Sequence, residues 1–135
     1  PMTIDTSFPK GQALAEWLQN LGATSTQGSI DLHETYHVVD GVNAPTSRWL
    51  YSTSPASVQT LSFNTPIGVQ PADQCGRAVY SNFHIAGGQS GGGTTFPAEC
   101  DPNPLTPQEK VMEFMLFDLS SCVQDDSKPP IPPVN

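Results

Sequence analysis

The clearest hydrophobic pattern lies between residues 104 and 123, where apolar residues recur at three- and four-residue spacing. The segment Thr106-Pro107-Gln108-Glu109 supplies a capping hydroxyl, a proline at the first helical position and a glutamate at the third. The apolar positions behind it are Val111, Met112, Phe114, Met115, Leu116, Phe117, Leu119 and Val123. The sequence therefore predicts a helix that begins at this capping box and is buried around most of its circumference.

A second helical pattern occurs near the N-terminus. Leu14, Trp17, Leu18 and Leu21 fall at positions i, i+3, i+4 and i+7, and Gly22 follows as a stop signal. We expect a helix of about three turns that begins near Pro9.

Several short segments have the composition of strands, being rich in β-branched and aromatic residues and bounded by glycine, proline or asparagine. They cover residues 28–32, 36–39, 47–51, 58–63 and 77–85, and residues 1–6 form a strand or loop before them. Ser54-Pro55 separates two of these segments and suggests a hairpin. The two helices and the short strands together predict the α/β class, with a small mixed or parallel sheet flanked by two helices. One such arrangement is an incomplete flavodoxin-like half.

Length and the proline-rich end define the expected domain organisation. The 135 residues are enough for one domain, which we place at residues 1–124. Residues 125–135 contain an acidic pair followed by Lys128-Pro129-Pro130-Ile131-Pro132-Pro133, which favours an extended linker or tail. Because Pro1 precedes Met2 and no signal peptide is present, we expect a segment of a longer precursor.

Charge narrows the range of partners. Five basic and thirteen acidic residues give a net charge of −8, so there is no basic stripe for nucleic acid. No apolar run approaches the ~18 residues of a membrane span. The charged fraction is 13%, about half the usual ~25%. Together with fourteen prolines, this composition suggests a secreted or cell-surface protein.

Residues 33–37 match the H-E-x-x-H pattern of zinc peptidases, with His33 and His37 as metal ligands and Glu34 as general base. The pattern requires a helix, but Thr35 and Tyr36 favour a strand, on which the two histidines would lie roughly 13 Å apart. We therefore expect an extended or irregular segment and a chance match, and no cofactor. A zinc peptidase stays open as an alternative.

Two further patterns bear on catalysis. Gly88-Gln89-Ser90-Gly91-Gly92 matches the G-x-S-x-G nucleophile elbow, but the glycines that follow cannot open a helix, so a loop is favoured. His84 lies at the end of the predicted strand 77–85, the position where open α/β sheets bind ligands. It is a candidate catalytic residue, and the alternative is a histidine hydrogen-bonded to loop backbone.

Trp49 and Tyr51 suggest a glycan site as another alternative. On a strand these two residues share one face at a separation of about 6.6 Å, which suits stacking on sugar rings. Packing within the core or the sheet would use the same spacing.

Three cysteines predict one disulfide and one unpaired thiol. If the helix after the 77–85 strand runs back antiparallel to it, Cys122 returns to the level of Cys75. We therefore expect a Cys75–Cys122 disulfide in an oxidising compartment, which leaves Cys100 for a partner thiol.

Four segments resemble a module of large bacterial secreted proteins with Ig-like domains. They are residues 8–18, 63–68, 75–84 and 106–122. The ending of strand, histidine and helix is similar to the ThuA-like, class I glutamine amidotransferase-like fold. This resemblance implies an α/β sheet with helices on both faces, of which the chain would supply the C-terminal half. Only His84 carries over from that family's catalytic residues, because Cys75 precedes a strand instead of ending one.

The expected function is a non-catalytic structural or interaction module of a secreted bacterial cell-surface protein. An apolar helix and unpaired sheet edges imply a partner, either the upstream part of the same precursor or another chain. The alternatives are a ThuA-like hydrolase that uses His84, the zinc peptidase, and a glycan-binding module.

Overall fold

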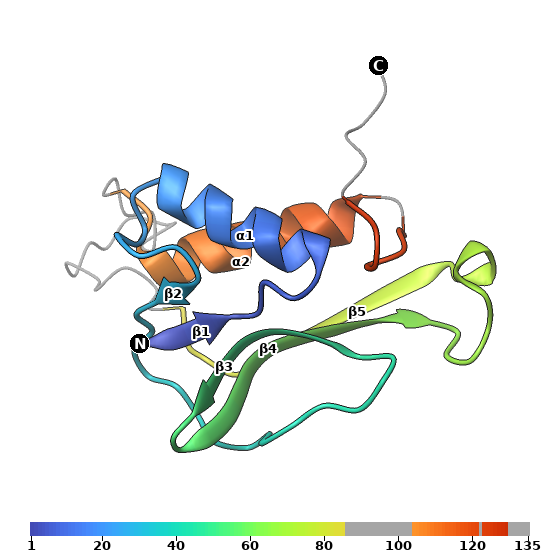
Figure 1. The fold of residues 1–135 in the computed structure, drawn as a ribbon, viewed down its shortest axis with the longest axis horizontal. Helices are drawn as coiled ribbons and strands as arrows, with labels where there is room; N and C mark the ends of the chain where they lie inside the picture. The colour runs from blue at the N-terminus through green and yellow to red at the C-terminus, as the bar shows by residue number, and fades with distance from the viewer. Residues whose placement is uncertain (86–103, 122, 130–135) are drawn as a thin grey trace, which may run out of the picture.

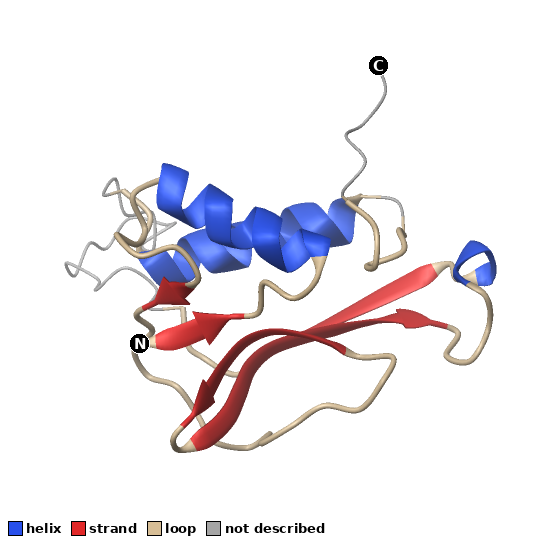
Figure 2. Cartoon of the chain, in the orientation of Figure 1, coloured by secondary structure: helices blue, strands red, loops and turns tan. Residues whose placement is uncertain are grey.

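A computed structural model of the chain describes residues 1–85, 104–121 and 123–129 (Figure 1). The elements in chain order are β1 (Met2–Ile4), α1 (Pro9–Asn20), β2 (Ser29–Ile30), β3 (Ser47–Thr53), β4 (Ala56–Thr65), the 3-10 turn η1 (Pro71–Asp73), β5 (Gly76–Ser81) and α2 (Pro107–Ser120). The five strands form one sheet in the order β2-β1-β3-β4-β5. Both helices lie side by side on the same face of that sheet (Figures 1 and 2).

The α/β class with a small sheet and two helices is confirmed, but the expected strand direction was wrong. Every neighbouring pair of strands is antiparallel. A parallel pair needs a crossover of a dozen or more residues, whereas β3 and β4 are joined by the short turn at Ser54-Pro55. The sheet is therefore neither mixed nor parallel, and neither helix covers its second face (Figure 2).

Both predicted helices form where their local signals place them. α1 begins at Pro9, and Gly22, with φ of 65°, follows its end. At the start of α2, the Glu109 amide donates to Thr106 Oγ1 at 3.3 Å, and the Thr106 amide donates to Glu109 Oε2 at 2.7 Å. Both bonds of the capping box are thus present.

The hydrophobic core fills the space between the two helices and the sheet. Trp49 from β3 is fully buried, and its ring packs edge-on against Phe8 with centroids 4.9 Å apart. Phe114 of α2 approaches both Trp49 and Trp17 of α1, at 6.0 and 5.6 Å. The buried apolar residues are Ile4, Leu14, Ala15, Leu18, Ile30, Trp49, Leu50, Val58, Phe83, Val111 and Met115.

The expected burial of α2 around most of its circumference was wrong. Only Gln108, Val111 and Met115 of this helix are buried. Leu116, Phe117 and Leu119 are 57%, 62% and 40% exposed, and we call these three residues the α2 apolar stripe. The reason is the one-sided layer: α1 and the sheet cover the inner face of α2, and the opposite face is left at the surface (Figure 1).

Residues 33–37 are irregular, as predicted, and residues 36–39 do not form a strand. The Tyr36 carbonyl accepts hydrogen bonds from the side chains of Ser57, Gln59 and Asn82, at 3.3, 2.8 and 2.8 Å. These side chains replace a sheet ladder as the partners of the backbone. The predicted strand 77–85 likewise ends at Ser81, and beyond it an isolated bridge joins Phe83 to Thr35.

Replacing Gly11 by alanine tests how closely α1 packs on the chain before it. Helix propensity alone predicts a gain of about 1 kcal/mol. However, a Cβ at this position would overlap the carbonyl oxygen of Asp5 and contact the Phe8 ring. We expect Gly11→Ala to lose about 2 kcal/mol of unfolding free energy in urea denaturation. Gln19→Ala, on the exposed side of α1, is the control, and a more stable Gly11→Ala would contradict the close approach.

Candidate functional site

Four charged side chains from four separate segments meet under the C-terminal half of α2. Lys10 of α1 lies 2.8 Å from Asp118 Oδ1 and 3.2 Å from Asp126 Oδ1. Arg77 of β5 contacts Asp118 through Nε and Asp126 through Nη1, the latter at 2.9 Å. The side chains of Lys10, Arg77 and Asp118 are 3%, 4% and 7% exposed, and that of Asp126 is 16% exposed. We call these four residues the buried ion-pair cluster.

The strand and helix positions explain why the cluster lies on the inner face of the sheet. Arg77 is paired across the sheet with Asn64, and its Nη1 donates to Asn64 Oδ1 at 2.8 Å. Its Nη2 donates to Ser62 Oγ at 2.8 Å, and the same hydroxyl accepts from Trp49 Nε1 at 2.7 Å. The cluster is therefore continuous with the hydrophobic core through Ser62.

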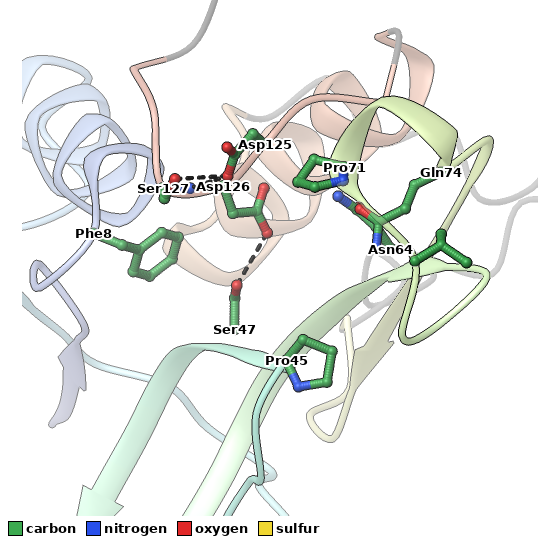
Figure 3. Close-up of a pocket in the computed structure, with 10 residues that line it drawn as sticks. Phe8, Pro45, Ser47, Asn64, Pro71, Gln74, Asp125, Asp126 and Ser127 are labelled. Carbon is green, nitrogen blue, oxygen red and sulfur yellow. Dashed lines mark hydrogen bonds between the residues drawn. The ribbon is translucent and has the colours of Figure 1, made fainter.

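A pocket of about 390 Å³ opens beside the cluster (Figure 3). Its lining residues are Phe8, Pro45, Ser47, Asn64, Val69, Pro71, Gln74, Asp125, Asp126 and Ser127. Asp126 points from the C-terminal segment toward β3, where Ser47 Oγ donates to its Oδ2 at 3.0 Å (Figure 3). The pocket thus combines apolar walls with one carboxylate from the buried ion-pair cluster.

Asp125 forms the rim of this pocket and of a second one. Its Oδ1 accepts from the Ser127 hydroxyl at 2.7 Å and from the Ser127 amide at 3.0 Å. These two bonds, the hydroxyl first, hold the pKa of Asp125 below its ordinary value of 3.8. The second pocket, of about 600 Å³, shares Pro71 and Asp125 with the first. The walls of the second pocket come from residues 69–74 and 123–129, and these two segments also form part of the wall of the first.

Most polar groups of the first pocket are already bound to protein atoms. Asp126 contacts two cations and the Ser47 hydroxyl. The Asn64 amide accepts from Arg77 and donates to the Gln124 carbonyl at 2.9 Å. Because the cluster has two positive and two negative charges, its net charge is zero. This arrangement fixes the C-terminal segment on the sheet and leaves Asp126 engaged as a counter-ion.

The structure brings His33, Glu34 and His84 together, but through their backbones. Gln108 Oε1 accepts from the His33 amide at 2.7 Å, and its Nε2 donates to the carbonyls of His33 and His84 at 2.9 and 2.6 Å. The His84 amide donates to the Glu34 carbonyl at 3.3 Å, and its ring lies 5.3 Å from that of Tyr36. The role of Gln108 could not be predicted from the sequence, in which it shows only as a residue at the start of a helix.

The zinc alternative finds no support in the part of the chain that the structure describes. His33, Glu34 and His37 are exposed and lie in an irregular segment, so they do not share one helical face. Among residues 1–85, 104–121 and 123–129, no group of three or more histidine, cysteine, aspartate or glutamate residues could hold a metal ion.

Trp49 and Tyr51 do not form an exposed aromatic pair. Trp49 is 0% exposed and packs in the core, and the register of β3 with β4 shifts on either side of Leu50. Tyr51 is half-buried, and the Arg48 guanidinium lies 3.5 Å from its ring centroid. Arg48 also pairs with Asp5 at 2.9 Å. Trp49 therefore offers no face on which a sugar ring could stack.

The predicted disulfide lies partly outside the described residues. Cys75 is exposed, whereas Cys122 and Cys100 belong to the undescribed segments, as does the G-x-S-x-G motif at Ser90. None of the helices in the described residues has the length and apolar character needed to cross a membrane.

Comparison of the chain with protein-family models, with curated proteins and with solved structures found no match. The resemblance to ThuA-like modules of secreted bacterial proteins therefore stays a prediction from the sequence. The function must be inferred from the contacts described above.

Removing one carboxylate from the buried ion-pair cluster should be costly. In Asp118→Asn, Lys10 and Arg77 keep their charges with Asp126 as the remaining counter-ion. Breaking a buried pair from one side costs ~3–5 kcal/mol, and we expect a loss near the lower end in urea or thermal denaturation.

Asp125→Asn is the matched control, because this neighbouring carboxylate is outside the cluster and should change stability little. The double variant Lys10→Met, Asp118→Leu should recover part of the loss, since it replaces both partners. Equal stability of Asp118→Asn and Asp125→Asn would contradict a structural role for the cluster.

The pKa of Asp125 tests whether the Ser127 hydroxyl donates to this carboxylate at the rim of the pocket. In Ser127→Ala, loss of the hydroxyl donor should move the Asp125 pKa up toward 3.8, measured by NMR titration of its carboxyl carbon. Because the folded-state pKa is depressed, this carboxylate stabilises the fold above its unfolded-state pKa, and the contribution disappears as pH falls through the folded-state value. The stability difference between wild type and Ser127→Ala should therefore shrink below about pH 3.8. An unchanged pKa would show that Ser127 does not bind Asp125 in solution.

Proposed function

We propose that this chain is a non-catalytic structural or interaction module of a secreted bacterial cell-surface protein. One observation carries the proposal: the buried ion-pair cluster joins α1, β5, α2 and the segment 123–129 through charges that cancel each other. These ion pairs thereby bind the segment 123–129 to the rest of the module, directly before the proline-rich residues 129–133 of the sequence.

The contacts of the cluster support a structural role. A general acid or base needs a group that can exchange a proton with substrate and a pKa suited to that task. Asp118 contacts both Lys10 and Arg77, and Asp126 contacts the same two cations and the Ser47 hydroxyl. Carboxylates held in this way act as fixed counter-ions for the two cations.

The position of the buried ion-pair cluster indicates that it binds the C-terminal segment to the sheet. The segment 123–129 is bound to the sheet through Asp126 and through the bond from Asn64 to the Gln124 carbonyl. The prolines that follow in the sequence favour an extended, semi-rigid linker. If the first residues of a semi-rigid linker are bound to the module, the linker keeps a defined direction relative to the module. A domain that acts as a spacer needs such a defined direction.

The surface supports the interaction part of the proposal. The α2 apolar stripe places Leu116, Phe117 and Leu119 at the surface of one helix turn, and exposed apolar patches often mark interaction sites. The low charged fraction and the resemblance to modules of secreted bacterial proteins favour an extracellular setting.

An activity screen tests the non-catalytic part. Purified chain is incubated with p-nitrophenyl esters and with a quenched fluorescent peptide library, with and without added zinc. We expect the same rates for wild type, His84→Ala and the double variant His33→Ala, His37→Ala, because His33 and His84 are joined to the fold through backbone atoms and His37 is exposed.

Turnover that scales with protein concentration and is lost in His84→Ala would replace the proposal with the ThuA-like hydrolase. Zinc-dependent peptide cleavage lost in the His33, His37 variant would replace it with the zinc peptidase.

A further inference from the structure

The two edges of the sheet are unequal. The order β2-β1-β3-β4-β5 places β2 at one edge and β5 at the other. β2 has two residues, whereas β5 has six. Very short edge strands are one way in which proteins prevent further pairing, and that protection is missing at β5.

The register of β4 and β5 shows which backbone groups of β5 point away from the sheet. The Asn82 amide donates to the Gln59 carbonyl at 2.8 Å, which fixes the alternation of hydrogen-bonded pairs along the two strands. Tyr80 and Ala78 are then in hydrogen-bonded pairs with β4, and the backbone groups of Arg77, Val79 and Ser81 face the open edge. Within the described residues, no backbone hydrogen bond to these three is found.

The side chains of β5 do not block the edge. The strand contains no proline, and its one charged side chain, Arg77, is 4% exposed and bound in the ion-pair cluster. Tyr80 is 37% exposed, and Ala78 and Tyr80 alternate with the inward-facing Arg77, so they lie on the sheet face opposite the helices. Natural edge strands usually carry an exposed lysine, a proline or a bulge against pairing.

We propose that β5 pairs antiparallel with β5 of a second copy of this chain, about a twofold axis at Val79. The proposal rests on the function proposed above and names the partner of the interaction module. The result is a continuous sheet across two copies, in which the exposed edges of both are removed.

The strand is self-complementary in this register. With Val79 opposite Val79 of the second copy, Arg77 lies opposite Ser81, so each outward N–H of these three residues can donate to an outward C=O of the other copy. On the sheet face opposite the helices, Tyr80 lies opposite Ala78 of the second copy. A large side chain thus packs beside a small one, which adds a cross-strand contact on that face.

Charge allows the pairing even though each copy carries −8. At the edge itself the positive charge of Arg77 is cancelled by Asp118 and Asp126, and the other five residues of β5 are uncharged. Repulsion between the copies therefore acts over longer distances, where salt screens it with a length of about 8 Å at 0.15 M. Association should be stronger at that salt concentration than in dilute buffer.

Analytical ultracentrifugation of the full chain over a range of concentrations measures the association. We expect wild type to approach twice the monomer mass, and Val79→Pro and Tyr80→Lys to stay monomeric. Proline at 79 removes only an outward N–H, and lysine at 80 places like charges near the axis. Thr53→Lys, an exposed position on β3, is the charge control and should associate as wild type does. Circular dichroism checks that each variant is folded.

Amide hydrogen exchange of the unmodified chain gives an independent readout. Exchange at Arg77, Val79 and Ser81 should slow as concentration rises, while exchange at Ala78 and Tyr80, which already face β4, should not change. No mutation is needed for this alternation to appear.

Each other outcome overturns the pairing. A wild-type monomer with no concentration dependence rejects it, and concentration-independent protection at 77, 79 and 81 shows that the edge is filled within one chain. Association that survives Val79→Pro but is lost in Leu116→Ser, Phe117→Ser assigns the interface to the α2 apolar stripe, which leaves the module function intact. The activity screen described above decides separately whether the module function itself fails.

Discussion

The fold depends on moving two cations and two carboxylates out of water together. Each ion loses several kcal/mol of hydration on burial, and this loss is offset only when its partners are in place. Lys10 and Asp118 are separated by 108 residues in sequence, and Arg77 and Asp126 by 49. The cluster therefore forms only when α1, β5, α2 and the segment after α2 have all reached their positions. Partly assembled states leave a charge buried without a partner, and this requirement favours a single arrangement of the four segments.

The polar cluster and the apolar core are parts of one packing unit. Trp49 packs against Phe8 and Phe114 and donates its indole N–H to Ser62, which in turn accepts from Arg77. The indole N–H thus finds a partner inside the core, as buried tryptophan usually does. The position of the aromatic rings and the position of the charges are consequently set by the same strands, and a change in one affects the other.

The two helices and the hairpin could be predicted from local sequence signals. The features that could not be predicted depend on contacts between segments far apart in the sequence. The α2 start could be predicted because Thr106 and Glu109 form its capping box within four residues. Strand direction and the one-sided helix layer depend on contacts between distant segments. The spacing of Trp49 and Tyr51 suited both an exposed pair and core packing, and only the contacts of Trp49 with Phe8 and Phe114 decide for the core. In the sequence Lys10 and Asp118 resemble ordinary surface charges, because no neighbouring residue indicates that they form an ion pair. The burial of Gln108 is likewise understood only from its hydrogen bonds to the carbonyls of His33 and His84.

The loop before β3 is anchored by its backbone and not by its side chains. The Tyr36 carbonyl receives donors from Ser57, Gln59 and Asn82, and the Tyr36 amide donates back to the Asn82 carbonyl at 3.0 Å. The carbonyls of His33 and Val39 are bound by Gln108 and by the Val58 amide. Because every residue except proline supplies the same backbone groups, the loop can keep its path while its exposed side chains are exchanged. The exposed side chains of His33, Tyr36, His37 and Val38 thus form a surface whose chemistry can diverge at little cost to the fold, as in a display loop on a rigid scaffold.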